Sequence, residues 1–282
     1  MLVTAKEMLQ KAREGKYAIG AFNVENMEMV MAVLAAAEAK NSPVIMQTTP
    51  GTIKYAGVDY YYANVAAAAK RSSVPVVMHL DHGDSFQRAM AAYRAGYTSI
   101  MIDGSKLPFE DNIALTKRVV EACHPGDVYV EGELGKVGGK EDDLEGDDDN
   151  PYTDPEEAKI FVEKTGVDYL AIGVGTAHGV YKGIPKVNTD LIATIHDMVD
   201  VPLVLHGTSG VPDEQVITAV KNGICKVNYA TDLRIAFTRG AKEFMTEHPE
   251  AFDPKKYSKQ GMVEVQKYVE QKIEVCGSVG KA

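Results

Sequence analysis

Three of the seven histidines stand where short apolar runs of the chain end. His82 and His206 lie at the ends of two such runs, and His178 follows a third. Zinc in catalytic sites binds neutral imidazoles and keeps one position open. If the fold brings these run ends together, the sequence predicts a zinc site made of the three residues.

The other four histidines have simpler interpretations. His79 lies inside the same run as His82, and we interpret it as a structural residue inside the packed protein or on the opposite face. His124, His196 and His248 fall in helical or loop context and are expected at the surface.

Carboxylates accompany these histidines. Asp81 is adjacent to His82 and could be a metal ligand, a partner of a ligand, or a group that moves a proton. Because successive side chains of a strand point to opposite faces, Asp81 need not bind the metal that His82 binds. Asp103 and Glu133 end two further apolar runs and could hold a second cation or position water.

Two segments of small polar residues favour an anion site. The segments HGTSG (206–210) and NYAT (228–231) follow the last two apolar runs. Their open backbone and small donors suit a phosphate, and Thr231 could cap a following helix. Gly179 and Lys182 could add an N–H group and a positive charge. The alternative is ordinary turn chemistry, since the same residue types populate turns.

Eight short apolar runs must position these residues, and helical segments alternate with most of them. Nearly continuous apolar residues are typical of strands buried on both faces. The alternation predicts a (β/α)8 TIM barrel, whose C-terminal strand ends form one rim where the histidines meet. A doubly wound open sheet is the alternative. The predicted strands are 17–23, 43–47, 75–82, 98–103, 128–134, 169–175, 202–207 and 225–230.

The whole chain, residues 1–282, is predicted to form a single barrel domain. Residues 231–282 are expected to add C-terminal helices that pack on the outside of the barrel or on a partner subunit. Residues 135–153 break the pattern with a stretch rich in Gly and Asp, which is either a solvated acidic loop or a mobile lid. Asp154 and Pro155 are predicted to begin a helix after it.

Composition excludes several classes of protein. The formal net charge is −10, from 30 Lys and Arg against 40 Asp and Glu, which argues against a nucleic-acid or membrane-surface binder. No run reaches the roughly 18 apolar residues of a membrane span. Three cysteines without CxxC spacing favour a reducing cytoplasm. Seven acids lie within residues 141–149, so the charge still permits an anionic substrate elsewhere.

Seven motifs along the chain carry a resemblance to a known family. The sequence resembles the class II, zinc-dependent ketose-bisphosphate aldolases over nearly its whole length. The resemblance implies a (β/α)8 barrel that cleaves a ketose 1,6-bisphosphate, tagatose or fructose, into dihydroxyacetone phosphate and glyceraldehyde 3-phosphate. The motifs are AFNVEN (21–26), HLDHG (79–83), SIMIDGS (99–105), VEGELG (130–135), GTAHG (175–179), VLHGTSGVP (204–212) and KVNYATDL (226–233).

The resemblance also implies metal ligands. His82, His178 and His206 would bind the catalytic Zn²⁺, which would stabilise an enediolate as a Lewis acid. Asp103 and Glu133 match a second or alternate metal position, for a divalent metal or a monovalent cation.

Further roles follow from the same resemblance. Asp81 would be the proton donor and acceptor at the C4 hydroxyl, and Glu141 matches a carboxylate implicated in proton exchange. The partner is then a small phosphorylated sugar, and the enzyme is expected to be a cytoplasmic homodimer or homotetramer that binds neither nucleic acid nor membrane. Contacts with the sugar are implied for Asn23, Gly179, Lys182, Gly207, Thr208, Ser209, Asn228, Tyr229, Ala230 and Thr231.

The preferred ketose stays open. TTPGT (48–52) and NYATDLRIAF (228–237) resemble the tagatose-bisphosphate branch. TSGVP (208–212) resembles aldolases for other phosphorylated keto sugars, and a keto acid is a further alternative. Tyr229 replaces the small or aliphatic residue of related sequences and could alter the packing beside the phosphate. The candidate cations for the distal phosphate are Lys54, Arg234, Arg239 and Lys272.

Two other function classes compete with the aldolase. A barrel metal hydrolase would carry HxH on its first strand, where this chain reads AIGAFN (18–23). A non-catalytic subunit on an aldolase scaffold is disfavoured because Asp81, His82, His178 and His206 are all present.

Overall fold

Eight parallel strands close into a barrel in the computed structural model, which describes residues 1–135, 137–141, 144–146, 152–181 and 183–282. The strands are β1 (Ile19–Asn23), β2 (Val44–Thr48), β3 (Val76–Gly83), β4 (Ser99–Ile102), β5 (Tyr129–Leu134), β8 (Tyr169–Ile172), β10 (Leu203–Leu205) and β11 (Ile224–Tyr229). They pair in this order, and β11 returns to β1. The closure confirms the predicted (β/α)8 barrel and excludes the open sheet.

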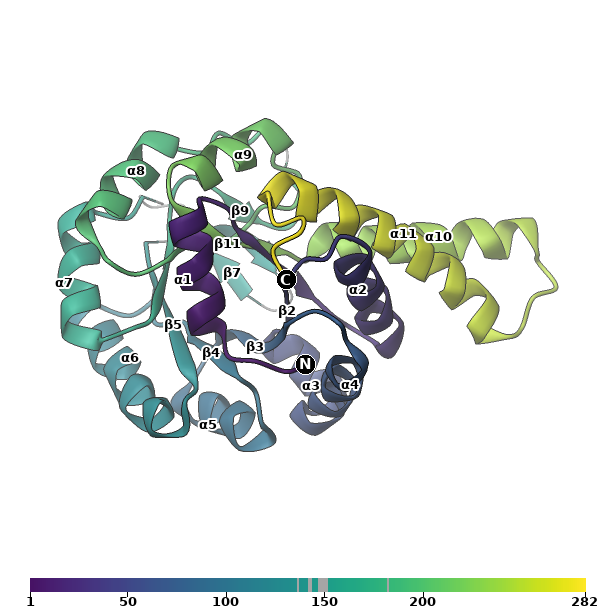
Figure 1. Ribbon diagram of the computed structural model, residues 1–282, viewed down its shortest axis with the longest axis horizontal. Helices are drawn as coiled ribbons and strands as arrows, with labels where there is room; N and C mark the ends of the chain where they lie inside the picture. The colour runs from purple at the N-terminus through teal and green to yellow at the C-terminus, as the bar shows by residue number, and fades with distance from the viewer. Residues whose placement is uncertain (136, 142–143, 147–151, 182) are drawn as a thin grey trace.

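Helices separate the strands and surround the barrel (Figure 1). Capping residues set their ends: Asp154 accepts hydrogen bonds from the first N–H groups of α7, Pro155 is its first residue, and Gly166 ends it in the left-handed region. The helices are α1 (Ala5–Gly15), α2 (Met27–Ala39), α3 (Pro50–Ala56), α4 (Val58–Arg71), α5 (Phe86–Ala95), α6 (Phe109–Cys123), α7 (Pro155–Thr165), α8 (Thr189–Met198), α9 (Asp213–Lys221), α10 (Thr231–Glu247) and α11 (Pro254–Cys276), with a 3₁₀ turn at His124–Gly126.

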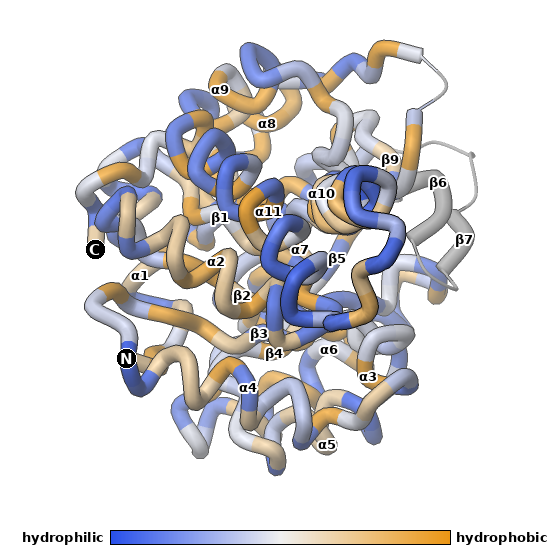
Figure 2. Tube along the Cα trace, turned by 90° about the vertical axis from the view of Figure 1, so that its right-hand side faces the viewer, coloured by the Kyte–Doolittle hydropathy of each residue, from blue (hydrophilic) through white to orange (hydrophobic). Residues whose placement is uncertain are grey.

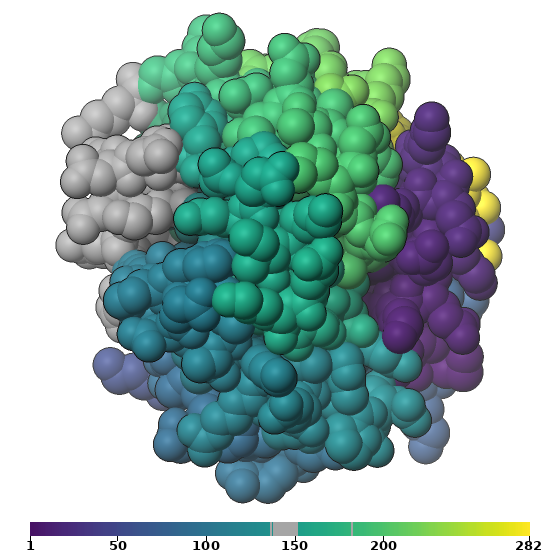
Figure 3. Space-filling model, turned by 90° about the vertical axis from the view of Figure 1, so that its left-hand side faces the viewer, coloured from purple at the N-terminus to yellow at the C-terminus, as the bar shows by residue number. Residues whose placement is uncertain are grey.

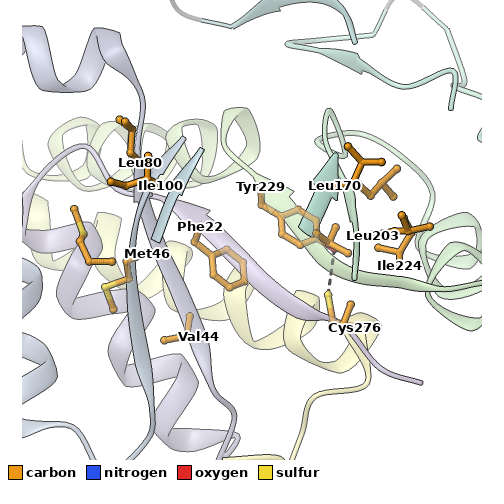
Figure 4. Close-up of a cluster of buried hydrophobic side chains, with 14 of the residues drawn as sticks. Phe22, Val44, Met46, Leu80, Ile100, Leu170, Leu203, Ile224, Tyr229 and Cys276 are labelled. Atoms are coloured by element: carbon orange, nitrogen blue, oxygen red, sulfur yellow. Dashed lines mark hydrogen bonds between the residues drawn. The ribbon is translucent and has the colours of Figure 1, made fainter. Parts of the chain in front are cut away.

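The outer face of the strands carries the main apolar core. Phe22, Met46, Leu80 and Tyr229 are completely buried between the barrel and its helices, and Figure 4 shows this cluster. These residues alternate along their strands with side chains that point into the barrel. The outer layer therefore supplies most of the apolar burial that holds helices to strands.

The inner face begins with an apolar floor. Ile19, Val77 and Val204 pack inside the amino-terminal end of the barrel, against Leu9 of α1. Further along β3, the inward side chain after Val77 is polar. The barrel interior thus changes from an apolar floor to a polar layer, and the polar layer lies toward the C-terminal rim.

Besides its apolar packing, helix α1 is joined to the barrel by the hydrogen bonds of Arg13. The guanidinium of Arg13 donates hydrogen bonds to the carbonyl oxygens of His196, Val199 and Val201. In Figure 3 the N-terminal segment accordingly lies beside the segment near residue 200, shown in green. This contact joins the start of the chain to the region between α8 and β10.

The last two helices form a hairpin that extends away from the barrel (Figure 1). Helix α10 follows β11 directly, and α11 returns to pack against α2, α9 and β1. The turn that joins them is mainly hydrophilic (Figure 2). The prediction of helices over residues 231–282 is confirmed, and α11 packs on the outside of the barrel.

The segment 135–153 contains more structure than the predicted loop. Strands β6 (Gly138–Glu141) and β7 (Leu144–Gly146) pair antiparallel, and β6 also pairs with β9 (Ala177–His178). Residues 136, 142–143 and 147–151, and the side chains of β6 and β7, lie outside the description. Within the part of the chain that is described, no helix is long and apolar enough to cross a membrane.

Candidate active site

Three histidines meet at the C-terminal rim. His82 comes from the end of β3, His178 from β9, and His206 from the residue after β10. His82 Nε2 lies 2.9 Å from His206 Nδ1, and one nitrogen of each of the three rings lies within 4.8 Å of the others. The fold therefore brings together the three residues that the sequence singled out.

The donor set fits a metal ion of the zinc type. Zn–N bonds of about 2.0–2.1 Å in a tetrahedron place ligand nitrogens about 3.3 Å apart, close to the separation seen between His82 and His206. In two of the three rings the other nitrogen bonds a carboxylate: His82 Nδ1 bonds Asp103 at 2.9 Å and His206 Nε2 bonds Glu131 at 2.8 Å. Such partners are typical of metal-binding histidines.

A second group of possible ligands shares His82. The group consists of His82, Asp103 and Glu133, and it uses the Nδ1 side of the ring. The Oε2 atom of Glu133 is buried 3.6 Å from His82 Nδ1 and has no hydrogen-bond partner among the described residues. The arrangement predicted for a second cation is therefore present.

The two carboxylates of this group have pKa values shifted in opposite directions. Burial and the charge of Asp103 raise the pKa of Glu133 well above its usual value. For Asp103, burial acts to raise the pKa, but the hydrogen bond and the charge of His82, together with the hydrogen bonds from Ser105, outweigh burial and the pKa is lowered. Asp103 is thus the ionised partner of His82, and Glu133 is the group that carries a proton more easily.

The pKa values of the histidines diverge as well. Burial lowers the pKa of His82, but the charge of Asp81 and the hydrogen bond to Asp103 outweigh it, and the pKa lies well above the usual value. Burial, followed by the charge of His82, lowers the pKa of His178 and of His206 well below the usual value. Two of the three rings are therefore neutral, as metal ligands must be.

Asp81 lies between two asparagines. The side-chain amides of Asn23 and Asn228 each donate a hydrogen bond of 3.0 Å to its carboxylate, and Gln47 donates to the Oδ1 atom of Asn23 at 2.8 Å. Burial raises the pKa of Asp81, but nearby positive charge, that of His82 first, and the hydrogen bond from Asn23 together outweigh burial and lower the pKa. The residue is an oriented, ionised carboxylate beside the histidines, suited to accept a proton.

A local distortion explains how the adjacent residues Asp81 and His82 reach the same site. Strict alternation would point them to opposite faces of β3. His82 has φ of +49°, in the left-handed region, and the register between β3 and β4 shifts between Leu80 and Gly83. This irregularity turns the end of the strand so that both side chains face the rim.

The loop after β10 packs closely on the strand that carries His178. Gly207 has φ of +64°, and a Cβ atom there would lie 2.7 Å from the carbonyl oxygen of Ala177. Only glycine fits both conditions. Thr208 and Ser209 are buried in the same loop, and Thr208 donates a hydrogen bond to the carbonyl oxygen of Asn228. The two segments expected to hold phosphate are thus in contact.

Two expectations for the second segment are wrong. Thr231 does not cap a helix, because it is the first residue of α10 and Ala230 occupies the capping position without a side-chain bond. The Tyr229 side chain does not face the phosphate loops: it is fully buried on the outer face, stacked on Phe22 with ring centroids 5.5 Å apart. The ring of Tyr229 also packs against Tyr268 and Cys276, in the outer layer.

The remaining expected residues have mixed outcomes. Gly179 follows His178 directly and has φ of +85°. Lys182 and the side chain of Glu141 lie outside the described residues. Among the candidate cations for the distal phosphate, the assignment of Lys272 is wrong, because this lysine is buried in the outer layer and bonds Asp213 at 2.6 Å.

Two other candidate cations also contact carboxylates. Arg234 donates to Glu25 through two nitrogens, at 2.6 and 2.9 Å, and Arg239 bonds Glu264 at 2.8 Å. The fourth candidate, Lys54, is exposed on α3.

Sequence reasoning missed a charged pair beneath the histidines. Glu131 and Lys226 are fully buried inside the barrel and bond each other at 2.8 Å. The signal was present, since each is a charged residue within an otherwise apolar run, and such residues are rarely buried unless paired. Gln47, which orients Asn23, was missed for lack of any comparable signal.

Comparison with known proteins places this site in a family. The sequence model described as class-II fructose-bisphosphate aldolase matches residues 3–281. The structure is similar to the YdjI aldolase of Escherichia coli K12, with 36% identity and a TM-score of 0.89 over all of both chains. It is also similar to a Coccidioides immitis protein assigned as a fructose-1,6-bisphosphate aldolase, with 30% identity and a TM-score of 0.88 over 98% of this chain and 96% of that one.

A third structure extends the likeness. The fructose-bisphosphate aldolase of Campylobacter jejuni shares 25% identity and a TM-score of 0.84 over 100% of this chain and 97% of that one. The family model spans nearly the whole chain, and the histidine cluster offers groups that could hold a metal ion. The chain therefore belongs to the class-II fructose-bisphosphate aldolase family and is a metal-dependent aldolase, a carbon–carbon lyase.

Proposed function

We propose that the enzyme uses Zn²⁺ to cleave a ketose 1,6-bisphosphate, tagatose or fructose, reversibly into dihydroxyacetone phosphate and glyceraldehyde 3-phosphate. The observation that carries the proposal is the pairing of the three facing histidines with a carboxylate oriented by Asn23 and Asn228. The first group suits a zinc ion, and the second suits a proton acceptor at a fixed position.

The protein groups divide the work of cleavage between them. Asp81 accepts the proton of the C4 hydroxyl as the C3–C4 bond breaks, and returns it to the aldehyde oxygen in the reverse direction. Asn23 and Asn228 hold its carboxylate during this transfer. A bound zinc ion would supply Lewis acidity for the negative charge that develops on the substrate.

Phosphate binding rests on backbone groups rather than on many cations. The loop Gly207–Ser209 and the start of α10 meet beside Asn228. The N-terminus of a helix and the N–H groups of tight loops favour an anion. Gly179 and residues 229–231 stay predictions for contacts with the phosphorylated sugar, and Glu141 and Lys182 stay predictions for proton exchange and for charge.

Metal removal tests the mechanism. Dialysis against a chelator should abolish cleavage of the preferred bisphosphate, and added Zn²⁺ should restore it, with Mg²⁺ as the control metal. Full turnover by protein shown to be metal-free would refute the proposal. Metal content and activity must be measured on the same sample.

A substrate with an unphosphorylated aldehyde end is the second candidate. Arg234, Arg239 and Lys272 each contact a carboxylate, which weakens the case for a distal phosphate bound within one chain. A comparison of kcat/KM for tagatose 1,6-bisphosphate, fructose 1,6-bisphosphate and the corresponding 1-phosphates separates the candidates. A preference for the 1-phosphates favours the second, and a large loss with them favours the first.

We further propose a homodimer or homotetramer in the cytoplasm. Phe252, Ile184 and Val180 are between 77% and 92% exposed, and exposed apolar side chains are often covered in an assembly. The three cysteines are free and buried, as suits a reducing compartment. Light scattering of the purified chain tests the oligomer, and a monomer at micromolar concentration would contradict it.

A further inference from the structure

Glu131 occupies a central place beneath the histidines. It is fully buried in β5, and its Oε1 atom lies 2.8 Å from His206 Nε2. Its Oε2 atom accepts a hydrogen bond from Lys226 at 2.8 Å and lies 3.5 Å from His79 Nε2. Each carboxylate oxygen therefore has its own neighbours on a different side.

The contact with Glu131 determines which nitrogen of His206 carries a proton. A carboxylate accepts hydrogen bonds, so His206 Nε2 must be the N–H donor. In the neutral ring the lone pair is then on Nδ1, the atom that faces His82 Nε2 at 2.9 Å. Without an acceptor below it, the ring could hold either tautomer or turn over.

His82 has the opposite arrangement. Its Nδ1 atom bonds Asp103, and its Nε2 atom faces the other histidines. Two ligands of one metal would thus use different ring nitrogens, each selected by a separate carboxylate on the far side of the ring.

The carboxylate of Glu131 is itself held in position by the surrounding layer. Lys226 is fully buried in β11, and a buried cation requires a charged partner. His79 bonds Ser99 at 2.6 Å and closes the other side. Because Lys226 bonds Oε2, the Oε1 atom stays directed at His206.

We propose that Glu131, held by Lys226, is a positioning residue that makes His206 an Nδ1 ligand of the catalytic metal. The proposal rests on the metal dependence stated above. The buried pair of Glu131 and Lys226 then has a specific effect on metal binding. It fixes the tautomer and the orientation of one metal ligand, His206.

The first experiment needs no variant. Wild-type enzyme labelled with ¹⁵N-histidine and loaded with ¹¹³Cd²⁺ should show cadmium coupling to Nδ1 of His206 and to Nε2 of His82. The His206→Ala variant assigns the His206 signals. Coupling to His206 Nε2 overturns the proposal.

The second experiment measures zinc affinity by competition with a chromophoric chelator. Loss of an outer partner of a ligand typically weakens metal binding by about 10–100-fold. We expect Glu131→Leu to fall in this range and Glu131→Gln to lose less, since its amide oxygen can still accept the N–H bond. Cys225→Ala, buried in the apolar floor one residue before Lys226 in β11 and without a contact to Glu131 or His206, is the matched control and should keep wild-type affinity.

The outcomes separate this proposal from the proposed function. Folded Glu131→Leu protein with wild-type zinc affinity overturns the positioning role, and lower affinity with a larger fall in kcat than rise in KM supports it. If Glu131→Leu does not fold, Glu131→Gln and the cadmium couplings decide. Full activity of metal-free wild type would defeat the zinc mechanism alone, because the coupling pattern is measured independently of turnover.

Discussion

The two faces of the same barrel strands contain opposite chemistry. Along β11, Lys226 and Asn228 point inward and bond Glu131 and Asp81, whereas Tyr229 points outward among apolar side chains. The inner polar groups are held by hydrogen bonds, which are directional. The outer groups are held by contact area, which is not directional.

This difference teaches where function and stability reside. The inner face near the rim places charges at a cost that only mutual pairing offsets. The outer face packs Phe22, Tyr229 and Cys276 between strands and α11 (Figure 4). Substitutions on the inner face should thus change catalysis more than folding, and substitutions on the outer face should do the reverse.

The largest expected effect is on the inner face. Asp81→Ala removes the proton acceptor, and kcat should fall by about 10²–10⁴-fold, the usual contribution of a general acid or base. Zinc content should stay at the wild-type level, because Asp81 belongs to neither group of possible ligands found among the described residues. Steady-state kinetics and metal analysis of the same sample check both statements.

Asp84→Ala is the matched control for that variant. Asp84 lies three residues further along, on the surface, and bonds Arg88. Exposed pairs of this kind contribute little, and kcat should be unchanged. Wild-type turnover by Asp81→Ala would move the proton role to another residue.

The next effect is on the outer face. Tyr229→Ala leaves a cavity where the ring stacked on Phe22, and the free energy of unfolding should drop by about 3–5 kcal/mol. The kcat of the folded variant should stay within a few-fold of wild type, since the ring does not face the site. Guanidinium unfolding and kinetics at a temperature below the transition measure the two quantities.

Tyr60→Ala provides the control, because this tyrosine is 68% exposed on α4. Its unfolding free energy should change little. A Tyr229→Ala enzyme of normal stability but without turnover would contradict the division of roles between the two faces.

The smallest effect concerns pH and the outer face. Burial raises the pKa of Cys276 to about 12, above the value near 9 of an unfolded thiol. The folded state keeps this advantage below pH 9 and loses it as the pH rises from 9 toward 12, by at most about 1.4 kcal/mol per pH unit. Unfolding free energies of wild type and Cys276→Ala, each compared with its own value at pH 7, should diverge between pH 9 and 10.5, with wild type falling more steeply. Parallel curves would show that the thiol ionises alike in both states and that burial does not raise its pKa.

Sequence reasoning succeeded where the pattern of residue types is compatible with few structures. Eight apolar runs separated by helical periodicity have few ways to bury themselves, so the barrel followed from the pattern. The closeness of His82, His178 and His206 followed from the barrel, because the carboxyl ends of parallel strands share one rim. The helices at residues 231–282 and the cap at Asp154 were also correct.

Errors arose where side-chain direction decided the outcome. Tyr229 and Thr231 stand in a motif next to Asn228, yet the alternation of β11 sends Tyr229 outward, and Thr231 is the first residue of α10 rather than its cap. Lys272 looked like a cation for substrate, but α11 places it in the outer layer beside Asp213. In the segment 135–153, β6 pairs with β7 and also with the distant strand β9, a pairing that no local pattern indicates.

By itself the sequence determined the barrel, its rim and the kinds of residue that gather there, because hydrophobic periodicity and residue chemistry are local properties of the chain. The tertiary structure alone decided which atoms face one another. The left-handed backbone at His82, the contact of Gly207 with β9, and the pair of Glu131 with Lys226 depend on the relative placement of strands far apart in the chain. Hydrogen bonds and metal ligands act over about 2–3 Å, a scale that only packing fixes.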